Sequence, residues 1–307
     1  MIAYGLRRLA GAIPTLFVIV TLAFFMMRAA PGGPFDSQRK LTPEVERNIK
    51  AAYDLDKPLW RQYVIYLGKV AHGDLGPSYK NKDFSVAQLI ATGLPVSALI
   101  GLLAMTLALL VGTSLGTLAA LHQNRWPDYS VMTAAILGIT IPSFVTAPIL
   151  TLLLGIYAGL LPVGGWNGGA WRNILLPVTV LSLPQIAIVA RMIRGSMVEV
   201  LHANYIRTAR AKGLSTRRIV LGHALRAAIL PLISYLAPAL AAVLTGSLVV
   251  EQIFGLPGIG RYFVQGALNR DYTLVLGVVI CYATLIIALN FLADLLLAFL
   301  DPRTRIS

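Results

Sequence analysis

Six long stretches of apolar residues alternate with shorter polar connections along this chain. A helix that crosses a bilayer needs roughly 20 mainly apolar residues, and each stretch approaches or exceeds that length. The pattern predicts an all-α polytopic membrane protein with six transmembrane helices. The predicted spans are residues 9–27, 96–121, 131–161, 174–190, 227–250 and 274–300. The fourth is the shortest and contains Pro177 and Pro184, which a bundle tolerates where neighbouring helices satisfy the freed backbone groups.

A polar region of about residues 31–94 separates the first two spans. It holds nine Lys+Arg and seven Asp+Glu, so we expect a small extracytoplasmic helical insertion that lies beside the membrane. Thr42 followed by Pro43 is typical of a helix start, and Ser85 with Gln88 fits a capping box. Apolar positions recur between them at helical spacing: Leu59, Tyr63, Tyr66, Leu67 and Val70.

The first apolar stretch has two interpretations. Arg7 and Arg8 precede it and the small residues Ala29 and Ala30 follow it, as in a cleaved signal peptide. Its apolar run is longer than the ~7–15 residues of a signal sequence. We therefore expect a retained first transmembrane helix.

The composition supports a membrane protein. Hydrophobic residues make up 57% of the 307 residues, charged residues make up 13%, and the mean hydropathy is +0.73, whereas a soluble chain carries about 25% charged residues. The excess of 26 Lys+Arg over 13 Asp+Glu would suggest nucleic-acid binding in a soluble protein. In a polytopic protein it encodes orientation, so we expect no nucleic-acid partner. Cys281 is the single cysteine, which excludes an intramolecular disulfide.

Basic residues in the short connections predict the orientation. Thirteen lie on one side of the predicted spans and three on the other, and Lys and Arg favour the cytoplasmic side. We expect both termini and residues 191–226 in the cytoplasm of a bacterium, with the chain multi-pass in its inner (plasma) membrane. The first set is Arg7, Arg8, Arg125, Arg191, Arg194, Arg207, Arg210, Lys212, Arg217, Arg218, Arg226, Arg303 and Arg305; the second is Arg172, Arg261 and Arg270.

The sequence offers no catalytic residue. The phosphate-binding pattern G-x-x-x-x-G-K-[ST] is absent, so we expect no ATP hydrolysis by this chain through such a loop. The four histidines are scattered and form no pattern of metal-ligand spacing. Ser143 and Ser182 have no neighbouring base in the sequence. We assign no catalytic, cofactor-binding or metal-ligating residue.

Two ionisable residues lie within about a helical turn of the apolar stretches. Arg28 ends the first span, and we expect its side chain to extend toward water at the external surface. Asp294 lies near the cytoplasmic end of the last span, where a pair with a cytoplasmic arginine is favoured over a proton relay. A proton-coupled carrier would need more charge near the middle of the membrane.

The longest cytoplasmic connection is patterned as two short helices. Asn204 is a candidate cap of a helix over residues 205–212, Gly213 is a candidate stop, and Ser215 is a candidate cap of a second helix. The small residues Ala209 and Ala211 would let a partner surface approach closely. A basic element lying on anionic lipid explains the same pattern.

The amino-acid sequence of this connection is similar to that of a known protein family. Residues 199–213 read EVLHANYIRTARAKG, and residues 223–231 read HALRAAILP. They resemble the cytoplasmic EAA loop of ABC importer permeases, in the peptide and nickel branch. The resemblance covers essentially the whole chain and is greatest to oligopeptide permeases. Its other segments are GSLVVEQIFGLPGIG at 246–260, NRDY at 269–272, DPR at 301–303, HGDLG at 72–76 and PVGGWNGG at 162–169.

The resemblance implies a type I ABC importer permease fold. It implies a division into residues 1–94, the first helix with the insertion, and residues 95–307, a core permease domain of five helices with the coupling loop at 199–231. The generic pattern begins with glutamate, whereas this chain has Arg207 there, so docking to an ATPase is transferred to the stretch as a unit. That stretch is Tyr205, Ile206, Arg207, Thr208, Ala209, Arg210, Ala211, Lys212, Gly213 and Leu214.

The resemblance also implies partners. These are a second permease subunit, two ABC ATPase subunits that bind ATP and Mg, an extracytoplasmic peptide-binding protein, a peptide substrate and membrane lipid. The glycine-rich segment after the fifth span is a candidate external element where substrate enters; a plain connecting loop is the alternative. Its residues are Glu251, Gly255, Pro257, Gly258 and Gly260. Prolines at 142, 148, 231 and 238 are candidate kinks.

Three function classes follow. The resemblance favours a permease subunit of an ATP-driven oligopeptide importer, or a member of the same family for dipeptides, nickel or another small peptide-like solute. A secondary, ion-coupled transporter would need no ATPase. A membrane-anchored scaffold or receptor would use the basic segment to bind partners without moving a solute.

Overall fold

The apolar stretches form long helices in the computed structural model, which describes residues 2–29, 47, 54–81 and 83–300. The expected helix start at Thr42 and Pro43 lies outside these residues. Five described helices are long and apolar enough to cross a membrane, and a bent pair of helices makes a sixth if it is one span. The five are α1 (Ile2–Ala29), α4 (Val86–Leu121), α7 (Trp171–Leu201), α11 (Leu230–Phe254) and α13 (Tyr272–Leu300).

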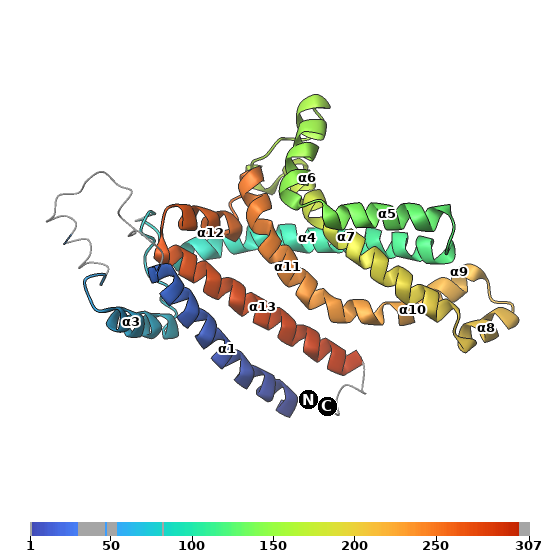
Figure 1. Ribbon diagram of the computed structural model, residues 1–307, viewed down its shortest axis with the longest axis horizontal. Helices are drawn as coiled ribbons and strands as arrows, with labels where there is room; N and C mark the ends of the chain where they lie inside the picture. The colour runs from blue at the N-terminus through green and yellow to red at the C-terminus, as the bar shows by residue number, and fades with distance from the viewer. Residues whose placement is uncertain (1, 30–46, 48–53, 82, 301–307) are drawn as a thin grey trace.

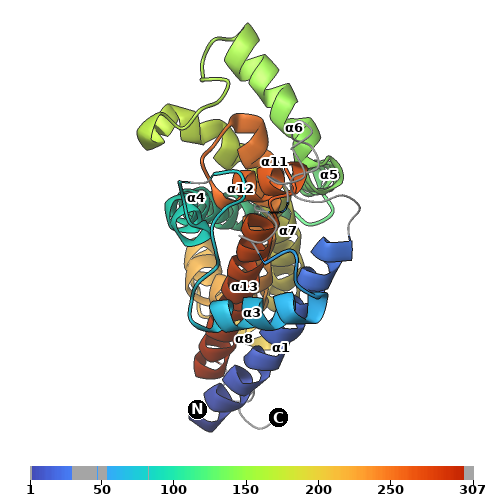
Figure 2. The same cartoon turned by 90° about the vertical axis from the view of Figure 1, so that its left-hand side faces the viewer.

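The predicted third span is not a single helix, and this part of the prediction was wrong. Residues 131–161 contain the end of α5 (Trp126–Thr140), then α6 (Ser143–Leu150) and a π-helical turn η1 (Thr151–Tyr157). The two helical parts meet at 104°, and α6 projects from the bundle (Figures 1 and 2). Ile141 takes an extended conformation at the bend because the ring of Pro142 disfavours a helical residue before it.

The fourth span, in contrast, is a helix of 31 residues that includes Pro177 and Pro184. It is longer than the predicted residues 174–190 at both ends, and its last turns include part of the connection expected to be cytoplasmic. α4 also begins earlier than predicted, at Val86. The expected division between residues 94 and 95 therefore falls inside a continuous helix, and the two-part organisation stays a prediction.

The start of α4 is fixed by the predicted capping box. The backbone N–H of Gln88 donates to Ser85 Oγ at 3.2 Å, and the N–H of Ser85 donates to Gln88 Oε1 at 2.9 Å. Two backbone donors that lack helical partners are satisfied reciprocally. An isolated antiparallel bridge joins Pro77 to Ser85 just before this point.

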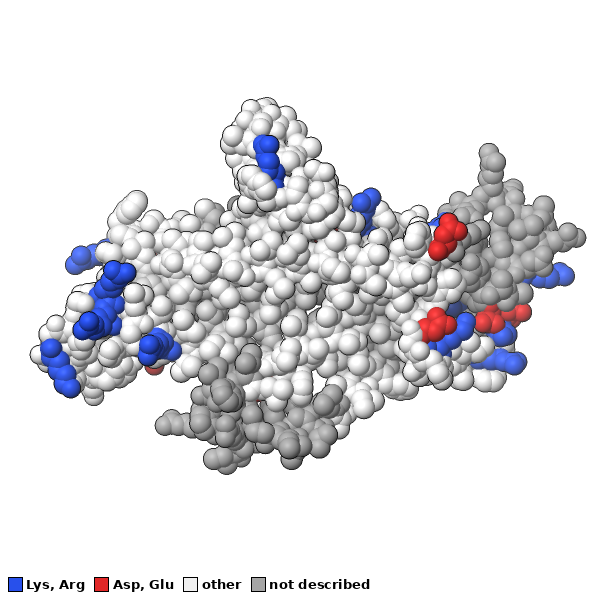
Figure 3. Space-filling view, turned by 180° about the vertical axis from the view of Figure 1, so that it is seen from behind, with Lys and Arg blue, Asp and Glu red and all other residues white. Residues whose placement is uncertain are grey.

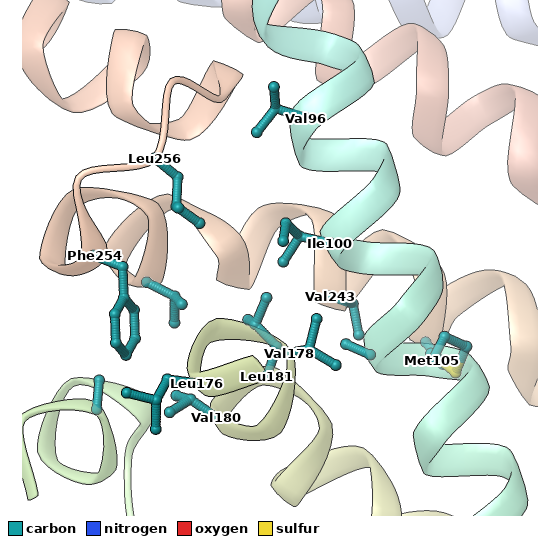
Figure 4. Packing of buried hydrophobic residues seen from close by; sticks show 14 residues of the cluster. Val96, Ile100, Met105, Leu176, Val178, Val180, Leu181, Val243, Phe254 and Leu256 are labelled. Carbon is teal, nitrogen blue, oxygen red and sulfur yellow. The ribbon is translucent and has the colours of Figure 1, made fainter. Parts of the chain in front are cut away.

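The helices α4 and α7 pack backbone to backbone. A methyl group on Gly112 would lie 2.8 Å from the side chain of Val189, and one on Gly116 would overlap the carbonyl oxygen of Ala190. Small residues at such positions let helices approach closely in a membrane. α11 crosses the same pair, and the central core lies where the three meet (Figure 4). The labelled core residues are Val96, Ile100, Met105, Leu176, Val178, Val180, Leu181, Val243, Phe254 and Leu256.

Short helices gather at the two ends of the bundle. One end carries α8 (Asn204–Ala211), α9 (Thr216–Ile219), η3 (Val220–Ala224) and α10 (Leu225–Ala228), and the other carries α3 (Leu59–Ala71) and α12 (Ile259–Leu268) (Figure 1). A short 3-10 turn, η2 (Asn167–Gly169), precedes α7. Lys and Arg cluster at the α8 end, whereas both signs of charge occur at the opposite end and the middle is mostly uncharged (Figure 3). This is the charge distribution of a membrane-spanning bundle.

Candidate functional site

The predicted coupling stretch forms a short helix at the basic end of the bundle. α8 spans Asn204–Ala211, one residue earlier at each end than the predicted 205–212. Ala203 holds the capping position, and its side chain makes no cap, so the prediction that Asn204 caps this helix was wrong. Ser215 occupies the predicted capping position of α9, although its side chain makes no cap hydrogen bond there.

One side of α8 is anchored in the protein. Ile206 is fully buried and Ala209 is 5% exposed, and both belong to a hydrophobic cluster with residues of α7 and α9 such as Ile193 and Ile219. The expectation that Ala209 faces a partner is therefore wrong, because its methyl group packs inward. The other side is exposed and presents Tyr205, Arg207, Thr208, Arg210, Ala211 and Lys212.

Gly213 ends α8 in the predicted manner. Its φ is +76°, a left-handed conformation that glycine adopts without the steric cost of a side chain. The N–H of Gly213 donates to the carbonyl of Arg210 at 2.9 Å, and that of Leu214 donates to Ala209 at 3.3 Å. These bonds form a Schellman motif, so α8 has a fixed end and the chain leaves it in a defined direction.

The glycine-rich segment forms a buried junction between α11 and α12. Glu251 in the last turn of α11 is fully buried, and its Oε2 accepts the N–H of Gly260 at 2.8 Å and that of Arg261 at 3.3 Å. Ser97 Oγ of α4 accepts the N–H of Ile259 at 2.9 Å. A carboxylate is a favourable partner for the free N–H groups at the start of a helix.

Two glycines make this junction possible. A methyl group on Gly258 would lie 2.6 Å from Ser97 Oγ and would overlap the Glu251 carboxylate, and one on Gly260 would lie 2.5 Å from the Cα of Leu248. Gly255 has a φ of +65° and ends α11 with a bond from the Leu256 N–H to the Glu251 carbonyl at 2.9 Å. As predicted, this segment is interrupted and does not form one continuous helix. Its role where substrate enters stays a prediction.

An ion pair that the sequence analysis missed joins α5 to α7. The guanidinium of Arg194 contacts both carboxylate oxygens of Asp128, from Nε and Nη2, at 2.6 Å each. Asp128 is 1% exposed and also accepts the N–H of Asn124 at 2.9 Å. The two charged residues are 66 positions apart, so spacing gives no signal for the pair.

Arg28 does not extend into water, contrary to prediction. It donates from Nη1 to Gln62 Oε1 of α3, and its guanidinium lies 5.1 Å from the ring centre of Phe24 and 5.5 Å from that of Tyr272. Gln62 is 8% exposed. The arginine therefore connects α1 to α3 and α13, and the aromatic rings offset part of the cost of taking it from water.

Comparison with known proteins agrees with the sequence resemblance. Residues 112–306 match the family described as binding-protein-dependent transport system inner membrane component, and residues 1–100 match its N-terminal counterpart. The oligopeptide transport system permease protein OppB of Haemophilus influenzae is 53% identical over 306 residues, which cover 99% of this chain and 100% of the relative. OppB of Escherichia coli K12 is 54% identical over 305 residues, with the same coverage. The dipeptide transport system permease protein DppB of Bacillus subtilis is 41% identical over 306 residues, which cover 100% of this chain and 99% of that protein.

Proposed function

The chain belongs to the family of binding-protein-dependent transport system inner membrane components, and we propose that it is the permease subunit of an ATP-driven ABC importer that moves oligopeptides. The observation that carries this proposal is full-length similarity. Relatives named oligopeptide permeases are 53% and 54% identical to this chain over nearly all of both sequences, whereas a relative named a dipeptide permease is 41% identical.

Transport, and not catalysis, is the role of this chain. Energy would come from two separate ABC ATPase subunits that bind ATP and Mg. A second permease subunit, an OppC-like paralogue, would complete the pathway, and an extracytoplasmic peptide-binding protein would deliver the substrate. The family description supports a binding protein as a partner.

We assign the exposed side of α8 as the surface that docks on an ATPase subunit. Ile206 and Ala209 anchor the helix in the cluster that also holds Ile193 of α7, so a displacement of α8 would be transmitted to a long helix. The Schellman motif at Gly213 fixes the C-terminal end of α8. Both chain termini and α8 would lie in the cytoplasm, which is the side that the clustered Arg and Lys favour.

Affinity purification in a mild detergent tests the assembly and the docking surface together. The tagged chain is expected to retain two P-loop ATPases and one further permease. Replacement of Arg207 and Arg210 by Glu inverts the charge of the exposed side without touching Ile206 or Ala209, and it is expected to release the ATPases while the second permease remains. Arg125→Glu is the matched control, because Arg125 is exposed in the connection between α4 and α5 and is not part of α8.

Release of the ATPases by the control Arg125→Glu as well as by the variant with Glu at positions 207 and 210 would contradict a docking surface on α8. A chain that purifies alone in several detergents and moves peptide in response to an ion gradient, without ATP, would identify a secondary transporter instead. Retention of partners without any peptide flux in vesicles would point to a scaffold.

A further inference from the structure

The helix α3 carries an apolar face that the described part of the protein leaves uncovered. Positions 60, 64, 67, 68 and 71 follow the helical period and lie on one side of the helix. We call this side the outer stripe; it consists of Trp60, Val64, Leu67, Gly68 and Ala71. Trp60 is 67% exposed and Val64 is 58% exposed, and no atom lies within 4 Å of a methyl group added to Gly68. The outer stripe therefore faces away from the bundle.

Another side of α3 is attached to α1. The hydroxyls of Tyr63 and Thr21 are hydrogen-bonded at 2.6 Å, and Arg28 donates from Nη1 to Gln62 Oε1. The ring centres of Tyr63 and Phe25 are 5.2 Å apart. Because these contacts use a different side of the helix, they do not account for the apolar residues of the outer stripe.

The contacts with α1 also set the depth of α3 in the membrane. Thr21 lies eight residues before Ala29, the last residue of α1, which is about 12 Å along a helix. The part of α1 that is long and apolar enough to cross a membrane is Ala10–Ala29, so Thr21 lies within that span. α3 lies across this end of α1 (Figure 2). It therefore runs beside the membrane-spanning helix and not in the water beyond its end.

The surroundings of the outer stripe are those of the membrane interface. Apolar side chains are exposed in the same turns of α1, where Leu22 and Met26 are 57% and 71% exposed. Arg61 is exposed directly after Trp60, and α3 contains no acidic residue. A helix with an exposed apolar face, bordering basic residues and a tryptophan is typical of a segment that lies at the boundary of lipid headgroups and acyl chains.

We propose that α3 is an in-plane membrane anchor, whose outer stripe inserts into the bilayer leaflet at the end of the molecule opposite α8. Trp60 and Val64 contact acyl chains, and Arg61 contacts lipid phosphates. α3 is then held from two sides, by α1 and by lipid, which keeps the polar region between α1 and α4 at one height above the membrane. The proposal concerns the lipid contacts of α3 and does not depend on the solute that is transported.

Quenching of tryptophan fluorescence tests the depth of the outer stripe. The full-length chain has four tryptophans, and replacement of Trp126, Trp166 and Trp171 by Phe leaves Trp60 alone. The protein is placed in nanodiscs of phosphatidylcholine and phosphatidylglycerol. Lipids brominated on the acyl chains are expected to remove most of the Trp60 emission, whereas acrylamide in the water is expected to have little effect.

A matched chain carries its single tryptophan on the opposite side of α3. It combines Trp60→Phe with Lys69→Trp, which moves the indole by nine positions, or about two and a half turns. Lys69 is exposed, and its ammonium lies 4.0 Å from the carboxylate of Asp54. Emission from position 69 is expected to be quenched by acrylamide and to be unaffected by the brominated lipids.

Trp60→Phe in the chain that keeps the other three tryptophans gives a second measurement, which does not depend on folding of the triple variant. Its quenching by brominated lipid is expected to be smaller than that of the wild type. Equal quenching of positions 60 and 69 by the brominated lipids would overturn the proposal. Protection of Trp60 from acrylamide only after addition of a peptide-binding protein would also overturn it, because the outer stripe would then be a surface for that protein.

Discussion

The carboxylate of Glu251 accepts a hydrogen bond from the backbone N–H of Gly260 at 2.8 Å, and so ties the last turn of α11 to the first turn of α12. The bond is buried, and the two residues are nine positions apart. The short helix α12 is thus held against the bundle by the Glu251 side chain at its N-terminal end and by the close fit of Gly258 and Gly260.

Replacement of Glu251 by Ala is expected to loosen α12. The change leaves the N–H groups of Gly260 and Arg261 without their acceptor, which costs about 1–3 kcal/mol. Hydrogen exchange of the α12 peptides should rise, and the unfolding temperature in detergent should fall. Glu199→Ala removes an exposed carboxylate and should change neither the hydrogen exchange of α12 nor the unfolding temperature. Unchanged hydrogen exchange of α12 in Glu251→Ala would contradict the capping role of Glu251.

The contact of α4 with α7 depends on Gly116. A methyl group there overlaps the carbonyl oxygen of Ala190, so Gly116→Ala must push the helices apart, at a cost of about 1–3 kcal/mol. The unfolding temperature is the measurement. Gly11→Ala in α1 is the control, since no atom lies within 4 Å of its added methyl group, and it should not destabilise the protein.

The pair of Asp128 with Arg194 is expected to show a measurable coupling energy. Arg194 is only about a quarter exposed and binds both carboxylate oxygens, so the pair should contribute about 1–2 kcal/mol, more than a typical surface pair. A double-mutant cycle with Asp128→Asn and Arg194→Gln, read from chemical unfolding, measures it. Additive single effects would show that the two side chains are not coupled.

Gly213→Ala should disturb α8, the proposed coupling helix, without unfolding the bundle. A side chain at a φ of +76° costs about 1–2 kcal/mol, and the Schellman motif that ends α8 would distort. In the assembled transporter, peptide-stimulated ATP hydrolysis is expected to fall. Gly222→Ala is the control, because Gly222 lies nearby with open space around it and without a positive φ. Normal stimulation of ATP hydrolysis in Gly213→Ala, together with its loss in Gly222→Ala, would refute the assignment of α8 as the docking helix.

Local chemistry in the sequence was enough to locate several features. Ser85 and Gln88 predicted a capping box that the structure contains. Gly213 predicted the stop of a helix, which ends at Ala211, one residue earlier than expected. Such features depend on backbone groups only a few positions away, so their partners are visible in the sequence.

The inward side of α8 was predicted wrongly because the helix has only eight residues. Ile206 and Ala209 are three positions apart and lie on one face, but two small or apolar residues among basic ones do not distinguish a core contact from a partner contact. The bend at Pro142 carried a clearer signal, since the residue before a proline avoids the helical region.

Hydrophobic periodicity, charge in the connections and family resemblance thus determined the class of protein, its helical content and the location of the short helix α8, which we propose as the coupling helix. These three properties depend on side chains that act on the nearby backbone or on the membrane, so their effect can be inferred from the sequence. Only the tertiary structure decided that Glu251 caps α12, that Asp128 meets Arg194, and that Arg28 donates to Gln62. Those contacts join residues from different helices, and the energy of a buried charge depends on which partners the packing of the helices brings within hydrogen-bonding distance.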